Sequence, residues 1–143
     1  MSRATLRMRA LSKGLIIHET KINRSSKTKA IVAFLVCEKV RPHLATLMGN
    51  TGFRALLSRA LSLATTEVPW LRAVRVRADG SLEETEERET KIQAKDMAEG
   101  GVVLVAQLLG LLVAFIGTNL TLRVIREVWP KLSLKDWDSD KGD

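Results

Sequence analysis

Apolar residues recur at helical spacing in the middle of the chain. Starting from Phe53 they fall at positions i, i+3, i+4, i+7, i+8 and i+11, which is the pattern of one face of an amphipathic helix. Asn50 or Thr51 can cap the start of this helix, and Pro69 predicts that it ends before that residue. The residues of the apolar face are Phe53, Leu56, Leu57, Ala60, Leu61 and Ala64.

A continuous apolar run occupies residues 30–37. The run alone fits a buried strand or a buried helix, but later apolar positions continue it at helical spacing and favour a helix. Pro42 is expected to kink this helix or to start a fresh turn, because proline lacks an N–H and clashes with the preceding turn. Gly49 is a suitable C-terminal stop. The continuing positions are Val40, Leu44, Leu47 and Met48.

Residues 74–77 alternate valine with arginine, and Asp79 and Gly80 follow them. Alternation predicts a strand, and Asp-Gly is a strong signal for a β-hairpin because both central positions of its tight turn favour positive φ. A two-residue turn would set Arg75 opposite Glu84, which is a favourable cross-strand pair. The sequence therefore allows one short hairpin in an otherwise helical chain.

The most apolar segment lies near the C-terminal end of the sequence. Residues 101–117 contain a single polar side chain, Gln107, and the segment continues to Val128 without a proline. A continuous helix over these 28 residues would be about 42 Å long. A helix that is apolar on every face is buried in protein or in lipid. Two further helices and a hairpin leave part of it uncovered, so we expect a second copy, another protein or a bilayer to cover the rest.

Small residues recur every four positions along this segment and allow two helices to approach closely. Packing within the chain is the alternative use of the same spacing. The sequence nevertheless predicts a helix-packing interface, through which the chain binds itself or another protein. The predicted interface residues are Ala106, Gly110, Ala114 and Thr118.

A single membrane span is the competing interpretation of the apolar segment. Its length is near the lower limit for crossing a bilayer, and Arg123 and Arg126 could mark the cytoplasmic side. Gln107 within the segment and Asn119 directly after it favour a soluble helix instead. We therefore expect a cytoplasmic protein, with membrane association as the alternative.

The net charge of +7 is concentrated at the start of the sequence. Residues 1–30 hold eight basic side chains and one acidic side chain, whereas the other 113 residues hold 15 of each. We expect residues 1–29 to be a basic, disordered tail, since they offer little apolar surface to bury. A transit peptide and a basic arm for phosphates or anionic lipid share this composition. Nucleic acid is expected as a partner only through this tail.

Residues 30–130 are expected to form a single helical domain, and 131–143 a polar, flexible C-terminal tail.

No pattern in the sequence predicts catalysis. It has no Walker loop, no dinucleotide fingerprint and no zinc spacing, and its two histidines, His18 and His43, are too few for a metal site by themselves. Cys37 is the single cysteine and lies in an apolar run, where a buried thiol is the expected state. We expect no cofactor, no metal and no enzymatic activity.

Two stretches, residues 43–60 (HLATLMGNTGFRALLSRA) and 108–130 (LLGLLVAFIGTNLTLRVIREVWP), resemble a small helical module of bacterial proteins. The resemblance covers about residues 38–130 and brings no catalytic residues with it. It implies a soluble module linked to bacterial signalling.

The sequence as a whole predicts a mainly α protein, a small helical bundle with a long hydrophobic C-terminal helix. Its predicted function is non-enzymatic protein–protein interaction and assembly. The alternative is a single-span membrane protein with a basic N-terminal region.

Overall fold

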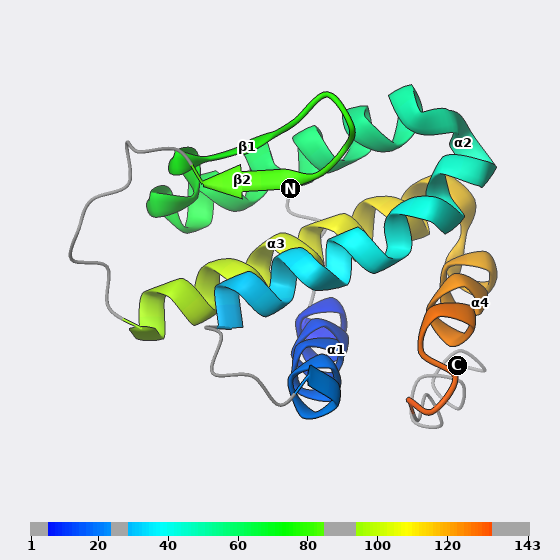
Figure 1. The fold of residues 1–143 in the computed structure, drawn as a ribbon, viewed down its shortest axis with the longest axis horizontal. Coiled ribbons are helices and arrows are strands. Elements are labelled where there is room, and N and C mark those ends of the chain that lie inside the picture. Colours follow the sequence, from blue (N-terminus) through cyan, green and yellow to red (C-terminus); the bar gives the residue numbers. More distant parts are fainter. Residues whose placement is uncertain (1–5, 24–28, 85–93, 133–143) are drawn as a thin grey trace.

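The computed structural model describes residues 6–23, 29–84 and 94–132, which form a bundle of helices with one small hairpin. The predicted fold class is confirmed: the described chain is mainly α, with a long apolar helix near its C-terminal end. Figure 1 shows α3 through the middle of the bundle, with α1 and α4 on one side and the hairpin on the other. The elements in chain order are α1 (Leu6–Asn23), α2 (Lys29–Glu67), the 3-10 helix η1 (Pro69–Ala73), β1 (Val74–Val76), β2 (Leu82–Glu84), α3 (Ala94–Ile116) and α4 (Thr118–Val128).

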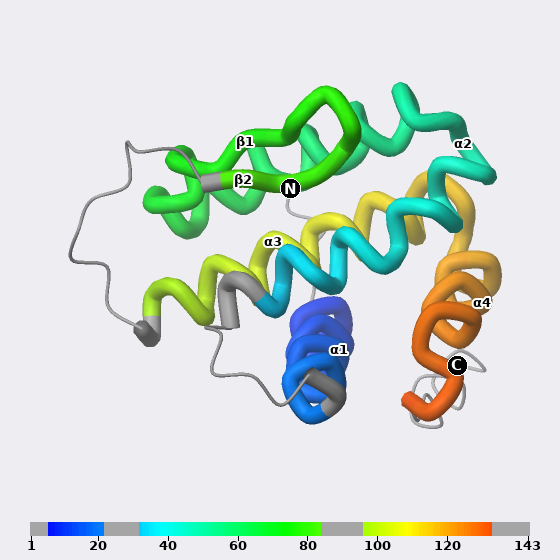
Figure 2. Tube along the Cα trace, in the orientation of Figure 1, coloured from blue at the N-terminus to red at the C-terminus, as the bar shows by residue number. Residues whose placement is uncertain are grey.

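Helix α2 is folded back on itself at Gly49, where φ is 80° and ψ is 159°. Figure 2 shows the reversal, which divides α2 into a first arm, residues 29–48, and a second arm, residues 50–67. The predicted stop at Gly49 is therefore confirmed, because only glycine adopts this positive φ without strain. The helix continues through Pro42 with helical φ and ψ, so the expected restart at this residue is wrong. Pro42 lies inside the first arm and is exposed, so water can bond to the carbonyl that it leaves without a donor.

Helix α1 corrects the expectation of a disordered tail over residues 1–29, since residues 6–23 are helical and packed on the bundle. Its inner face buries Leu11, Leu15 and Ile16, which join the same apolar cluster as α2 and α3. These positions follow helical spacing, and their burial offsets the entropy of ordering a segment that is otherwise basic. Residues 1–5 and 24–28 of the expected tail lie outside the described residues, as do residues 133–143 of the expected C-terminal tail.

Polar contacts fix α1 in place. The Glu19 carboxylate is fully buried and accepts an ion-paired hydrogen bond from Lys39 of α2, with an Nζ–Oε1 distance of 2.5 Å. Its other oxygen accepts a bond of 2.8 Å from the indole Nε1 of Trp129, which directly follows α4. The hydroxyl of Ser12 donates to the carbonyl of Val102 in α3 at 2.8 Å. Because a buried charge is stable only when paired and hydrogen-bonded, Glu19 specifies where α1 lies against its neighbours.

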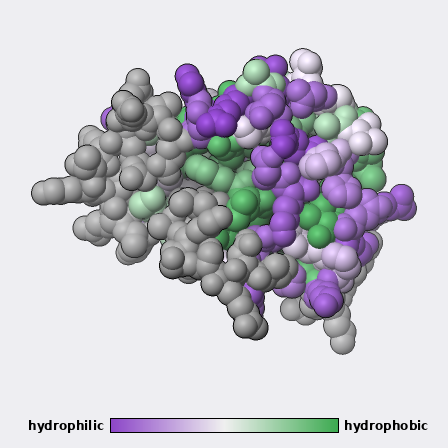
Figure 3. Space-filling model, in the orientation of Figure 1, coloured by the Kyte–Doolittle hydropathy of each residue, from purple (hydrophilic) through white to green (hydrophobic). Residues whose placement is uncertain are grey.

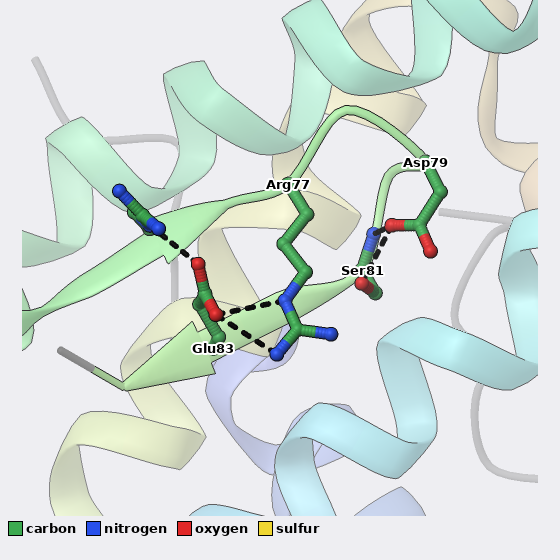
Figure 4. Close-up of polar contacts among 5 residues, drawn as sticks. Arg77, Asp79, Ser81 and Glu83 are labelled. Carbon is green, nitrogen blue, oxygen red and sulfur yellow. Dashed lines mark hydrogen bonds and ion pairs between the residues drawn. The ribbon is translucent and has the colours of Figure 1, made fainter.

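The hairpin is present, but its register differs from the predicted one. Arg75 pairs with Glu83 and Val74 pairs with Glu84, so the expected pairing of Arg75 with Glu84 is wrong by one residue. The loop has an additional residue because the N–H of Gly80, at φ 90°, closes a turn onto the carbonyl of Arg77. Figure 4 shows Glu83 accepting bonds from Arg77. Arg75 also donates a hydrogen bond to Glu83. These bonds hold the pKa of the Glu83 carboxyl below its usual range.

Helix α3 ends at Ile116, so the expected continuous helix over residues 101–128 is wrong. Gly117 has φ 89°, and a new helix, α4, begins at Thr118. A Cβ at Gly117 would meet no atom within 4 Å. Glycine is therefore needed here for its backbone conformation rather than for space. The break turns the chain so that α4 packs back on both α3 and α2 (Figure 1).

Candidate protein-interaction site

A shallow apolar groove lies between the turn of α2 and the C-terminal end of α3. Its volume is about 500 Å³, and Arg59 is the one charged side chain among the residues that line it. Gly49 ends the first arm of α2 and Gly117 follows the end of α3, and residues next to both breaks line the groove. The lining residues are Met48, Gly52, Ala55, Leu56, Arg59, Leu111, Ala114 and Phe115, and we call this surface the α2–α3 groove.

Small side chains make the hollow of the α2–α3 groove, and a large one stands beside it. Gly52, Ala55 and Ala114 leave space between the two helices. Phe115 is 68% exposed, which is unusual for a phenyl ring that the chain could have buried in its core. Figure 3 shows a mainly polar face with smaller apolar areas, some of them toward the end of the molecule where α2 turns back. The groove therefore combines an apolar hollow with an apolar projection.

The structure separates the four predicted interface residues. Ala106 and Gly110 are buried within the bundle and face the chain's own helices, whereas Ala114 is exposed and lines the α2–α3 groove. Thr118 belongs to α4 and is half-buried. The four residues do not form one stripe on one helix, because the break at Gly117 separates Thr118 from the others. Of the predicted set, only Ala114 reaches the groove.

The expected shortage of cover for the apolar segment is corrected for the middle of α3. Residues 103–110 are all buried, and α2 and α1 supply the largest parts of their surroundings. The expectation did not count α1 as a packed helix, so it underestimated the cover available. From residue 111 onward the cover is incomplete, since Ala114 and Phe115 are exposed. The apolar side chains of α3 that are exposed, Ala114 and Phe115, therefore lie at its outer end.

Sequence reasoning missed the α2 side of the groove. Met48 ends the first arm of α2, whereas Gly52 and Ala55 lie in its second arm, and their approach to α3 follows from tertiary packing alone. Gly49 was a usable signal for the turn alone, because its positive φ ends the first arm of α2 and a Cβ there would meet no atom within 4 Å. Phe115 carried a weaker signal, since one exposed ring cannot be told from a buried one in a run that is apolar throughout.

The titratable groups of the described residues offer little for chemistry. No group of three or more His, Cys, Asp or Glu side chains that could hold a metal ion occurs in residues 6–23, 29–84 and 94–132. Cys37 is buried, and burial raises the pKa of its thiol to about 12. A thiol in this state is protonated at neutral pH and unreactive, as expected for a small buried hydrophobic residue.

Helix α3 also meets the length and composition of a membrane span. The segment Asp96–Ile116 is apolar enough to cross a bilayer, and 61% of its most apolar window is buried inside the protein. The core helix of a soluble bundle has the same properties, so composition does not separate the two settings.

Comparisons of this chain with models of protein families, with curated proteins and with solved structures give no match.

Proposed function

We infer that the chain is a non-enzymatic helical module that assembles with a second copy of itself through the α2–α3 groove. The observation that carries this proposal is the exposed Phe115 ring, which stands beside an apolar hollow of about 500 Å³. Large aromatic side chains that enter apolar pockets supply much of the binding energy at protein interfaces. A hollow of this size accommodates a phenyl ring together with its neighbours.

A second copy is favoured as the partner because the groove offers both halves of a contact. In a twofold dimer the same patch lies on each subunit, so it must be complementary to itself. Phe115 provides the projection, and Gly52, Ala55 and Ala114 provide the hollow into which the same ring of another copy fits. The exposed Arg59 lies at the rim, where its charge stays hydrated.

The test is the mass of the purified protein in buffer without detergent, measured by light scattering over a range of concentrations. The wild-type chain should form a dimer or larger closed oligomer. Phe115→Asp and Ala114→Arg should each shift it to the monomer, because they place a charge in the apolar contact. Leu6→Asp is the matched control: Leu6 is 86% exposed on α1, away from the groove, and this change should leave the mass unaltered.

A wild-type monomer at all concentrations would refute the proposal of self-association. An oligomer that withstands both groove substitutions would place the contact elsewhere. A monomer that binds a different protein, with loss of binding in Phe115→Asp, would keep the groove as an interaction site but replace the second copy as its occupant.

The alternative function is a single-span membrane protein with a basic N-terminal region. The apolar length of Asp96–Ile116 favours it, and the burial of residues 103–110 by α1 and α2 favours the soluble bundle. High-speed centrifugation of cell extracts separates them, since recovery in the supernatant excludes the span. The cytoplasmic location and the link to bacterial signalling that the resemblance implies stay predictions.

A further inference from the structure

The outer face of α1 combines positive charge with exposed aliphatic side chains. Leu6, Lys13, Ile17 and Lys21 fall at spacings of 7, 4 and 4 residues, which places them on one side of the helix. Leu6 is 86% exposed and Ile17 is 49% exposed, while both lysines are exposed. We call these four residues the outer face of α1. Leu6 and Ile17 lie about 16 Å apart along the axis at ~1.5 Å per residue, so both can reach one flat surface.

Among the described residues, neither Lys13 nor Lys21 forms an ion pair with an acidic side chain. The one acid of α1, Glu19, points inward and is fully buried against Lys39 and Trp129. Arg9 forms an ion pair with Glu67 at 2.5 Å and is turned toward α2. Glu99 of α3 is the acid that lines the adjoining groove with Lys13 and Ile17. In the sequence as a whole, residues 1–30 hold eight basic side chains and one acid, so this part of the sequence is strongly basic.

We propose that the outer face of α1 binds the surface of an anionic membrane, with the helix lying in the plane of the headgroups. Lysines on such a face are attracted to acidic lipids, and the aliphatic side chains enter the boundary between headgroups and acyl chains. The exposed aliphatic groups favour lipid over nucleic acid. Phosphate contacts make no use of Leu6 or Ile17, and stacking on bases would need aromatic rings, which this face lacks.

This surface is separate from the α2–α3 groove. Figure 1 places α1 on one side of α3 and the second arm of α2 on the other, so a dimer through the groove leaves the outer face of α1 accessible. The bundle also keeps residues 103–110 of α3 buried, so the binding is to the membrane surface and no span enters the bilayer. The proposal therefore stands or falls independently of self-association.

The test is sedimentation of the purified chain with lipid vesicles. Binding is expected to vesicles that contain about one third phosphatidylserine and not to vesicles of phosphatidylcholine alone, and high salt should release the protein. Lys13→Gln/Lys21→Gln should weaken partitioning by roughly 25-fold, since each basic residue near the surface is worth about a factor of five. Ile17→Ser should weaken it by about fivefold, because half of that side chain is available for insertion.

Arg72→Gln is the matched control, because Arg72 is an exposed basic residue on η1, which packs on α2. It should change partitioning by less than about twofold. Equal binding to neutral and anionic vesicles, a bound fraction that high salt does not release, or an equal loss from Arg72→Gln and Lys13→Gln would each overturn the proposal. Salt-sensitive binding to a duplex oligonucleotide without binding to anionic vesicles would also overturn it, in favour of nucleic acid.

Discussion

The two parts of α3 have similar composition and opposite surroundings. Every residue from 103 to 110 is buried, whereas only Leu112 is buried among residues 111–116. Both stretches are apolar, so hydrophobicity does not distinguish them. The difference lies in the neighbours: α1 and α2 enclose the inner part, while among the described residues Phe115 at the outer end projects beyond this cover. Burial of the exposed apolar side chains at the outer end against another surface would therefore give the largest gain in free energy at the smallest cost.

The largest expected effect compares one side chain from each part. Leu108→Ala should lower the free energy of unfolding by about 2–5 kcal/mol, because Leu108 is 2% exposed and its truncation leaves a cavity. Phe115→Ala should change the free energy of unfolding of the monomer by no more than about 0.5 kcal/mol. Urea unfolding, measured at a concentration where the protein is monomeric, checks both. Similar losses from the two changes would show that the outer end is enclosed in solution.

A second comparison uses the small residues of the same helix. Gly110→Leu should destabilise the fold by about 1–3 kcal/mol, because Gly110 is buried and the added atoms overpack the core. Ala114→Leu, four residues further on, should leave stability nearly unchanged because Ala114 is exposed. Thermal unfolding of the two variants provides the measurement. If Gly110→Leu is tolerated as well as Ala114→Leu, the inner part of α3 is less tightly enclosed than the structure has it.

The smallest expected effect is in the hairpin. The hairpin lies outside both parts of α3 and serves as a reference for the comparison between them. The pKa of the Glu83 carboxyl is lowered by its bonds to Arg75 and Arg77. Its contribution to the stability of the hairpin is therefore present above the ordinary pKa of 4.5 and is lost as the pH falls through the lowered pKa. Acidification in that range should lower the protection factors of the amides in β1 and β2, that is, their protection relative to the intrinsic exchange rate at the same pH, while the protection factors in α3 stay unchanged. Hydrogen exchange measured by NMR tests this, with Glu83→Gln as a variant that should lose the pH response.

Local patterns in the sequence predicted most of the helical fold. The spacing after Phe53 and the stop at Gly49 describe backbone preferences that act within a few residues, and both are present in the structure. The hairpin was predicted, but its register depended on whether Gly80 sits in a two-residue or a longer loop. The break at Gly117 was missed because a glycine in an apolar run is compatible with a continuing helix.

The remaining features depend on partners that are distant in sequence. Helix α1 was taken as a tail because its basic composition outweighed the spacing of Leu11, Leu15 and Ile16. Burial of Glu19 could not be inferred, since its partners are 20 and 110 residues away. The α2 side of the groove likewise exists only after α2 has reversed onto α3. Of the candidate site, the sequence therefore indicated Ala114, and tertiary packing determined the rest.

The bond between Trp129 and Glu19 joins residues 110 positions apart in the order of synthesis. Glu19 is synthesised 110 residues before Trp129. For most of the time between the two, Lys39 is the partner available to Glu19. Helix α1 thus acquires its full set of bonds only when α4 has been made and has packed against the bundle. A ribosome stalled before Trp129 would hold a chain whose first helix is still incompletely anchored, a state that a protease could recognise.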